Sequence, residues 1–310
     1  MSRFRNALAI AVLATLLALV GRTALLPVDN LLYDIGLSSA ASKVPKDIVI
    51  LGIDEAFMKG RHAYLAPRDR LATLVRNVAE GKPKAIALDV WLDSRIDEGP
   101  RGVDAQLRDA LRYAKSHGVP VLLSDVPPDQ TEIGSDSENG QTAHGSVLPY
   151  FAKEARTGSV LFPLDRDGVV RWLPQEKPER PSMVAQMAAL GGAKPAALTA
   201  LRKSSWPIDF DGPPGTITTQ SAAEFLEPGL GALLQDQLVF IGATYSRSRD
   251  YMPTPYTRVG SKPMYGIEVM AQSTDSIRRG LPRDATGAAA RVESNRWTVP
   301  SLRCRTSAYS

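Results

Sequence analysis

Short, continuous apolar segments alternate with amphipathic segments along the first half of the chain. Three of them have the length and composition of buried strands: Asp47–Asp54, Ala85–Val90 and Val119–Ser124. Between them, Arg68–Glu80 and Val103–Ser116 carry apolar residues at helical spacing. Strands that are connected by helices pair in parallel, with the helices packed on the faces of the sheet. The sequence therefore predicts an α/β fold with a mostly parallel sheet and helices on both faces.

The second half adds elements of both kinds. The segments Gly158–Phe162 and Val169–Leu173 flank an Asp-Gly turn, which predicts a β-hairpin. Further along, the sequence predicts a helix over Pro181–Leu190, a buried strand over Leu238–Ile241 and a closing helix over Gly266–Ile277. Between the two halves lies Val126–Val147, which has no Lys or Arg and which we expect to be a mobile surface insertion.

The amino-terminal segment predicts how the chain is placed in the cell. Arg3 and Arg5 precede an uncharged segment whose apolar part is Ala7–Val20, and Thr23–Leu26 would complete a membrane crossing. A signal peptide and a buried core helix are the competing interpretations, but the sequence has no good small-residue cleavage site. We therefore expect residues 1–27 to be a membrane anchor, with the two arginines in the cytoplasm and the remainder outside it.

The net charge of +4 is carried by the two ends of the chain rather than by its body. Residues 1–22 have a net charge of +3 and residues 278–310 of +5, which leaves −4 for residues 23–277. A nucleic-acid interface needs a basic patch on the folded body, so we exclude nucleic acid as a partner. The single cysteine, Cys304, permits neither an intramolecular disulfide nor a cysteine zinc site.

Motifs that would indicate catalysis are missing from the sequence. It contains no Gly-rich phosphate loop with its Lys and no Gly-x-Ser-x-Gly motif. His62, His117 and His144 are neither paired at helical spacing nor close to a cysteine, so we expect no metal or triad role for them. Asp165-x-Asp167-Gly168 resembles the start of a calcium loop but lacks the distal Glu, and a turn is the expected role. We expect neither a cofactor nor a metal.

Acidic residues follow the predicted strands, at the edge where an open α/β sheet binds its ligands. Asp54 ends the first strand, Asp89 lies near the end of the second, and Asp250 follows the later one. Arg68 opens a helix, where a cation opposes the helix dipole unless an acid holds it. We predict that these four residues form a salt-bridge network, with a ligand site built from the same residues as the alternative. A phosphoaspartyl hydrolase is excluded because Ala56 occupies the position of its second Asp.

Taken together and in order, several of these segments resemble a CHASE domain of the second type. The segments that carry the resemblance are Val28–Asp34, Asp47–Asp54, Pro67-Arg68, Ala85–Asp89, Gly158–Arg171, Phe210–Gly215, Leu238–Ala243, Asp250-Tyr251 with Thr254-Pro255, and Gly266–Val269. Each is a generic strand or turn, and their colinear order over residues 28–277 makes the match specific. The resemblance implies an extracytoplasmic sensory domain of a bacterial receptor. In such receptors a transmembrane helix precedes the sensor, and further helices lead to a cyclase or a kinase.

The resemblance also indicates which residues to consider. Asp54, Arg68, Asp89 and Arg171 match recurrent motif positions, so with Asp250 they are candidates for ligand-proximal or structural roles. Met270 stands where relatives often have a His. The transmembrane helices expected after residue 277 are missing from the arginine-rich residues 278–310, which we interpret as a truncated or frame-shifted tail.

We therefore expect residues 1–27 to be the anchor, residues 28–277 the extracytoplasmic sensory domain and residues 278–310 the tail. The expected function is detection of an unknown small-molecule or stress signal by a single-pass protein of the bacterial inner membrane. It would act through a partner receptor or a homodimer, without a catalytic output of its own. The alternatives are a stand-alone periplasmic ligand-binding or interaction protein and a secreted hydrolase. A hydrolase would need His62 or His144 to lie beside Ser124 or Thr244.

Overall fold

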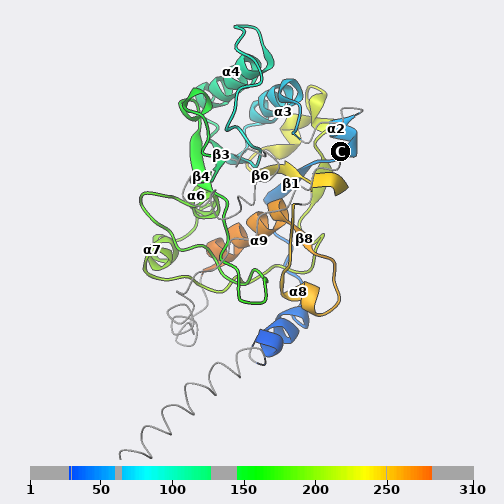
Figure 1. Ribbon diagram of the computed structural model, residues 1–310, viewed down its shortest axis with the longest axis vertical. Helices are drawn as coiled ribbons and strands as arrows, with labels where there is room; N and C mark the ends of the chain where they lie inside the picture. The colour runs from blue at the N-terminus through cyan, green and yellow to red at the C-terminus, as the bar shows by residue number, and fades with distance from the viewer. Residues whose placement is uncertain (1–27, 29, 60–64, 127–144, 249, 281–310) are drawn as a thin grey trace, which may run out of the picture.

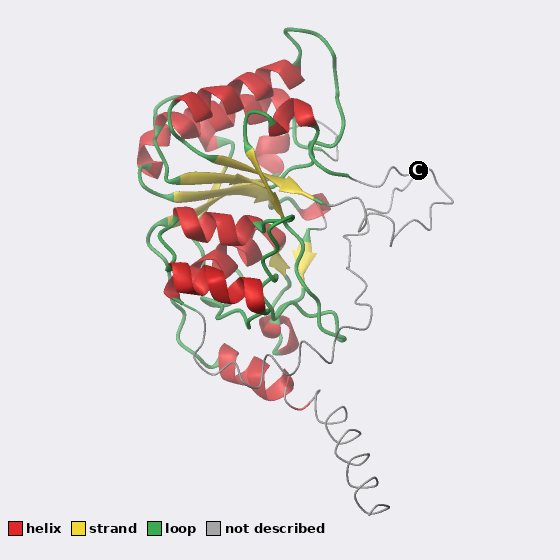
Figure 2. Cartoon of the chain, turned by 90° about the vertical axis from the view of Figure 1, so that its left-hand side faces the viewer, coloured by secondary structure: helices red, strands yellow, loops and turns green. Residues whose placement is uncertain are grey.

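The chain forms three layers, with a six-stranded sheet between two layers of helices (Figure 2). The computed structural model describes residues 28, 30–59, 65–126, 145–248 and 250–280. Within them the large sheet is parallel throughout, in the strand order β4-β3-β2-β6-β1-β5. The predicted α/β class, with a mostly parallel sheet covered on both faces, is confirmed.

The strands are short and mostly buried. They are β1 (Ile48–Ile53), β2 (Ala85–Leu88), β3 (Val121–Asp125), β4 (Arg156–Ser159), β5 (Thr219–Ser221) and β6 (Leu238–Ala243). β1, β2 and β6 lie at the centre and face helices on both sides, which is why their sequences are continuously apolar. A second, two-stranded antiparallel sheet consists of β7 (Tyr251–Met252) and β8 (Met264–Tyr265).

Alternate side chains of the central strands enter two separate apolar cores. Leu51 and Ile241 face α3 (Arg68–Glu80) and α4 (Val103–Ser116), together with the short helices α2 (Glu55–Met58), α5 (Pro149–Ala152), η3 (Glu224–Leu226) and η4 (Leu230–Leu234). Ile50 and Phe240 face the layer that contains α6 (Met183–Leu190), α7 (Pro195–Lys203) and α9 (Gly266–Arg279). The short helices η5 (Ser246–Ser248) and α8 (Pro255–Arg258) lie between β6 and α9 in the chain (Figure 1).

Helix α9 is surrounded by protein on all sides. Every residue from Gly266 to Ile277 is buried, including six polar or charged ones. The helix contacts β1 and β6 on one side and α6 on another. A third side receives the extended segment 208–217, as described below. Helix α9 therefore buries its polar side chains as well as its apolar face, unlike a helix on the surface of a domain.

The structure corrects the sequence prediction at three places. Gly158 and Ser159 belong to the parallel strand β4, so the predicted hairpin is reduced to one antiparallel bridge, between Leu164 and Val170, around a turn that Gly168 closes. Strand β5 and helix α7 were not predicted, because neither has a strong periodic signal. Helix α9 runs on to Arg279, so two of the arginines assigned to the tail belong to the folded body.

Several predictions fall outside the described residues. They concern the anchor in residues 1–27, His62, the bulk of the insertion (residues 127–144, with His144) and residues 281–310 with Cys304. Among the described residues, no helix has both the length and the apolar character that a membrane crossing requires.

Candidate functional site

The carboxyl ends of the three central strands meet at one edge of the sheet. Asp54 follows β1, Asp89 follows β2 and Thr244 follows β6. The Asp89 amide donates to Ile241 O (2.8 Å) and the Thr244 amide donates to Ile53 O (2.9 Å), so the three strand ends are held in register. β6 separates β1 from β2, although the chain runs from β1 through α3 directly to β2. Open α/β sheets bind their ligands outside the carboxyl ends of the strands.

Asp89 and Asp250 lie close enough at this edge for their charges to interact, and we call them the carboxylate pair. Both side chains keep some contact with solvent. Burial and the nearby charge of Asp250 raise the pKa of Asp89 to about 7. Burial raises the pKa of Asp250 to about 6. The pair therefore titrates near neutral pH, and the two carboxylates repel each other when both are ionised.

The first turn of α9 fixes the position of Asp250. The Gly266 amide donates to Asp250 O (3.0 Å), and a Cβ atom at position 266 would lie 2.5 Å from Asp250 Oδ1. The absence of a side chain at Gly266 thus lets the carboxylate approach the amino terminus of a 14-residue helix. The positive end of the helix dipole favours negative charge at this point. Asp250 is held where a change in its charge acts directly on α9.

Asp54 lies on the same edge but has a structural partner of its own. Its side chain accepts from the Phe57 amide (2.8 Å) and thereby caps the amino end of α2. The neighbouring Glu55 accepts from the amide and the hydroxyl of Ser246, at 2.9 Å each, and these bonds lower its pKa. This arrangement ties α2 to η5, which directly precedes the segment with Asp250.

Arg68 does not join the strand-end acids, so the predicted four-residue network is wrong. Its guanidinium pairs with Asp104 at the amino end of α4 and donates to Ser94 O (2.7 Å). Asp104, which is fully buried, also accepts from Arg95 and from the Ile96 amide. The amino ends of α3 and α4 lie together because the two helices pack side by side. The acid that holds Arg68 is therefore in the first turn of the next helix, a position at which acids are expected.

Arg171 connects three acids, none of which is a strand-end acid. It makes a two-pronged contact with Asp34 (2.8 and 2.7 Å) and donates to Asp165 (2.8 Å) and Asp167 (3.0 Å). Although burial lowers its pKa, hydrogen bonds with these three acids raise the pKa more. Trp172 Nε1 also donates to Asp165 (2.9 Å). The two acids of the Asp165-x-Asp167-Gly168 segment thus hold an arginine, as Asp34 does.

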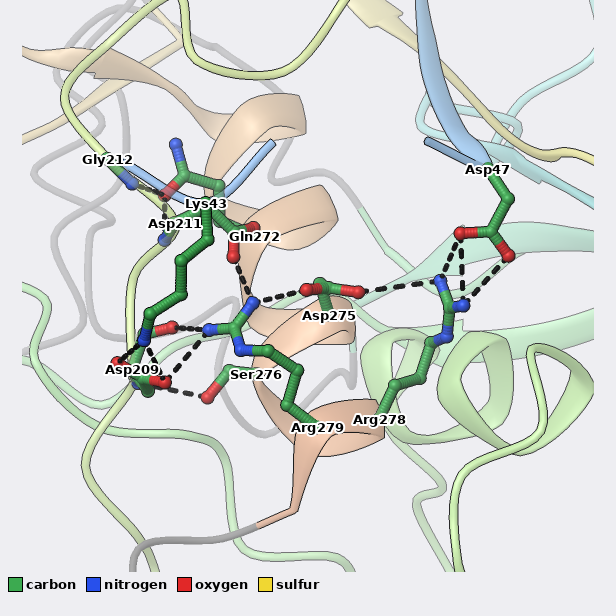
Figure 3. A network of polar contacts seen from close by, with 10 residues as sticks. All are labelled: Lys43, Asp47, Asp209, Asp211, Gly212, Gln272, Asp275, Ser276, Arg278 and Arg279. Atoms are coloured by element: carbon green, nitrogen blue, oxygen red, sulfur yellow. Dashed lines mark hydrogen bonds and ion pairs between the residues drawn. The ribbon is translucent and has the colours of Figure 1, made fainter. Parts of the chain in front are cut away.

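A second polar network lies at the other end of α9 and was missed from the sequence (Figure 3). Arg279 pairs with Asp275 of its own helix and with Asp209 and Asp211 of the neighbouring segment. Arg278 pairs with Asp47, the residue before β1, at 2.8 Å. Burial and the charge of Asp275 raise the pKa of Asp211 to about 7, although Arg279 opposes this. A Gly-Ile-Glu-Val start and an Arg-Arg end were visible in the sequence, but their partners were not.

The remaining side chains with metal-binding or nucleophilic chemistry lie apart from one another within the described residues. Among the described residues, no three metal-ligating side chains come together. Ser124 Oγ donates to Val90 O (2.8 Å). His117, the one histidine within the described ranges, stacks on Tyr113 at the carboxyl end of α4. Since α4 leads into the amino end of β3, this histidine is at the opposite edge from Ser124. A nucleophile and base are thus not brought together by the residues described.

The comparison with known protein families gives one match. The CHASE2 domain matches residues 8–302, which is nearly the whole chain. The chain belongs to the CHASE2 domain family. CHASE2 is an extracytoplasmic sensory domain, so the resemblance seen in the sequence is confirmed, and the family supports a sensory part of a receptor. Neither the curated proteins nor the solved structures gave a match. No relative therefore assigns a ligand to this CHASE2 domain.

Proposed function

We propose that this CHASE2 domain is the periplasmic signal-input part of a bacterial receptor in the inner membrane. In this proposal the carboxylate pair, Asp89 and Asp250, receives a small cationic ligand such as a primary amine. Residues 1–27 hold the domain at the membrane, and a partner receptor or a second copy carries the signal onward. The family supports the sensory role, and the geometry of the strand-end edge supports the place of the input.

One observation carries the proposal: two acids with raised pKa values lie within electrostatic reach of each other at the carboxyl edge of the central strands. A positive group between the carboxylates would relieve their repulsion and return both to the ionised form. The body of the domain, with Arg278 and Arg279 of α9 included, has a net charge of −2 over residues 23–279, which also favours a cation over an anion. A bound cation would therefore stabilise the carboxylate pair. An ordinary ion pair gains no such stabilisation, because each of its charges already has a partner.

The ligand would reach α9 through Asp250. Asp250 lies against Gly266, and α9 is buried along its whole length up to Ile277. A change in the charge or position of Asp250 is therefore passed to a rigid, closely packed element. Two arrangements of α9 that differ in their contacts with Asp250 would be enough to shift a receptor between two states.

The test is a thermal-shift titration of the full chain with amines and with divalent cations at pH 7.5. Stabilisation by a ligand that binds only the folded form grows with concentration, to about 2.7 kcal/mol at one hundred times Kd. We expect saturable stabilisation by an amine that is lost in Asp89→Asn and kept in Asp236→Asn, an exposed carboxylate. Equal responses of Asp89→Asn and the unchanged chain would contradict the site, as would a flat response to all cations.

A further inference from the structure

The first helix of the described residues exposes a row of apolar side chains while it buries polar ones. Val28 and residues 30–38 are helical, and this helix, dark blue in Figure 1, lies at one end of the molecule in both views (Figures 1 and 2). Its outward side chains are apolar and about half exposed: Val28 50%, Leu31 49%, Leu32 63% and Ile35 46%. They are spaced at i, i+3, i+4 and i+7, which places them on one stripe. We call these four residues the apolar stripe.

The face of this helix that points into the protein carries two polar side chains as well as Leu37, which packs against the core below α9. Asp34 is 1% exposed and pairs with Arg171, and Tyr33 Oη donates to Ile208 O (3.0 Å). A helix that covers a water-soluble domain normally does the opposite, since a buried ion pair costs desolvation and exposed leucines gain nothing from water. The contacts of Asp34 and Tyr33 fix which side faces outward, so the helix cannot turn its stripe inward without breaking them.

The chain before the helix indicates what covers the stripe. The apolar segment Ala7–Val20, extended by Thr23–Leu26, precedes it, and one residue, Pro27, separates Leu26 from Val28, the first described residue of the helix. Two steps along the chain span at most about 7 Å. A helix tethered this closely to a membrane-crossing segment lies at the headgroup layer, where the apolar face of an amphipathic helix inserts about 5–10 Å.

A second copy of the chain fits the stripe less well. A stable dimer buries about 800 Å² on each partner, and coiled coils need several heptads. Four half-exposed side chains over two helical turns offer much less than this. Insertion into the bilayer requires no such minimum buried area, because the membrane segment supplies the attachment.

We propose that the apolar stripe of Val28, Leu31, Leu32 and Ile35 inserts into the headgroup region of the outer leaflet. The inference rests on the membrane attachment in the proposed function and adds a second contact between domain and bilayer. Through Asp34 and Arg171 this contact fixes the orientation of the whole domain at the membrane surface. The carboxylate pair plays no part in it.

Nitroxide labels read by electron paramagnetic resonance test the proposal. The full chain with Cys304→Ser receives one cysteine, either Leu32→Cys in the stripe or Leu233→Cys, an exposed leucine (67%) on η4 at the other face of the sheet. Each labelled protein is reconstituted into phosphatidylcholine and phosphatidylglycerol vesicles. Power saturation then compares collisions with oxygen, which concentrates in lipid, and with a neutral nickel chelate, which stays in water.

We expect the label at Leu32 to favour oxygen and the label at Leu233 to favour the nickel chelate. Equal access of nickel to both positions in vesicle-bound protein would overturn the insertion and leave the attachment intact. Dipolar broadening at position 32 would identify a second copy as the occupant, and exclusion of both reagents would identify a protein contact, each against the proposal. Failure of the unlabelled chain to float with vesicles would overturn the attachment itself. The amine titration of the carboxylate pair remains a separate measurement.

Discussion

The guanidinium of Arg279, in the last turn of α9, pairs with the buried carboxylate of Asp211. The other oxygen of Asp211 is buried and has no hydrogen-bond partner within the described residues. Asp211 belongs to the segment 208–217, which follows α9 from its carboxyl end to its amino end. Ser276 Oγ accepts from the Asp209 amide (2.9 Å) and Gln272 Oε1 from the Asp211 amide (2.9 Å). Glu268 accepts from the Gly215 amide (2.9 Å). Side chains of α9 thus satisfy backbone groups that no strand partner reaches.

This arrangement makes α9 the element that joins the two polar regions of the domain. Its first residue, Gly266, lies against Asp250, and its last two residues bind Asp47, Asp209 and Asp211. The segment 208–217 also contacts the amino-terminal part of the domain. Its Ile208 O accepts a hydrogen bond from Tyr33 Oη, and its Asp209 pairs with Lys43 (2.9 Å). The carboxyl end of α9 and the helix that contains Tyr33 therefore both bind the segment 208–217.

Arg279→Met should destabilise the domain by about 1–3 kcal/mol, because it leaves the buried carboxylate of Asp211 without its cation. The double variant Arg279→Met with Asp211→Asn should recover part of that loss, since it removes the uncompensated charge as well. Arg247→Met, at an exposed arginine in η5, serves as the control. Urea unfolding followed by circular dichroism measures all three. A double variant less stable than the single one would show that the pair does not act as a unit.

Asp104→Asn should cost about 3–5 kcal/mol, because it leaves Arg68 buried beside a neutral group. Burial raises the pKa of Asp104, but hydrogen bonds from Arg68, Arg95 and nearby amides lower it more, so the folded value lies below the unfolded one. Its contribution is therefore complete above about pH 4 and is lost as the pH falls further. Asp109→Asn, 55% exposed on the same helix, is the matched control. Chemical unfolding at pH 7 should separate the two variants, and equal midpoints would contradict the role of Asp104.

The parts of this fold that could be predicted are those with local signals. The helices at Arg68–Glu80 and Val103–Ser116 have the predicted bounds, because amphipathic spacing and the glycines that follow mark both ends. The central strands were found because burial on both faces makes them continuously apolar. β5 was missed, since its three residues are partly exposed at an edge and owe their pairing to β1.

The sequence predicted the part of the site that follows from strand order, because residues after parallel strands lie at the same edge of the sheet. Placing Asp89 and Asp250 at strand ends follows from the alternation of strands and helices, and the structure brings these two together. The partner of Arg68 could not be deduced, since several acids were available and only the packing of α3 on α4 selects Asp104. The same holds for Arg171, whose partner Asp34 lies 137 residues away in the sequence.

Gly266→Ala should displace one member of the carboxylate pair while both carboxyl groups stay in the sequence. The added methyl group would lie 2.5 Å from Asp250 Oδ1, so the carboxylate or the first turn of α9 must move. Strain of this kind costs about 1–3 kcal/mol. Gly36→Ala is the control, because that helical position has no atom within 4 Å of the new Cβ, and it should gain about 0.5–1 kcal/mol. Thermal unfolding distinguishes the two, and a neutral Gly266→Ala would mean that Asp250 is not held against α9.

Asp89→Asn should make the domain more stable at alkaline pH. The pKa of Asp89 is about 7 in the folded state and about 4 in the unfolded chain, so between these values the folded form binds more protons. Its stability therefore falls as the pH rises from about 4 to about 7 and is constant above that range. Because Asn cannot ionise, the variant should lose the part of this decline that comes from Asp89 and gain at most about 4 kcal/mol at pH 8, with little difference at pH 4. Asp236→Asn, an exposed carboxylate, should keep the decline. Denaturant midpoints measured every half pH unit from 4 to 8.5 give both curves. Parallel curves for Asp89→Asn and the unchanged chain would mean that Asp89 ionises as freely as it does in water.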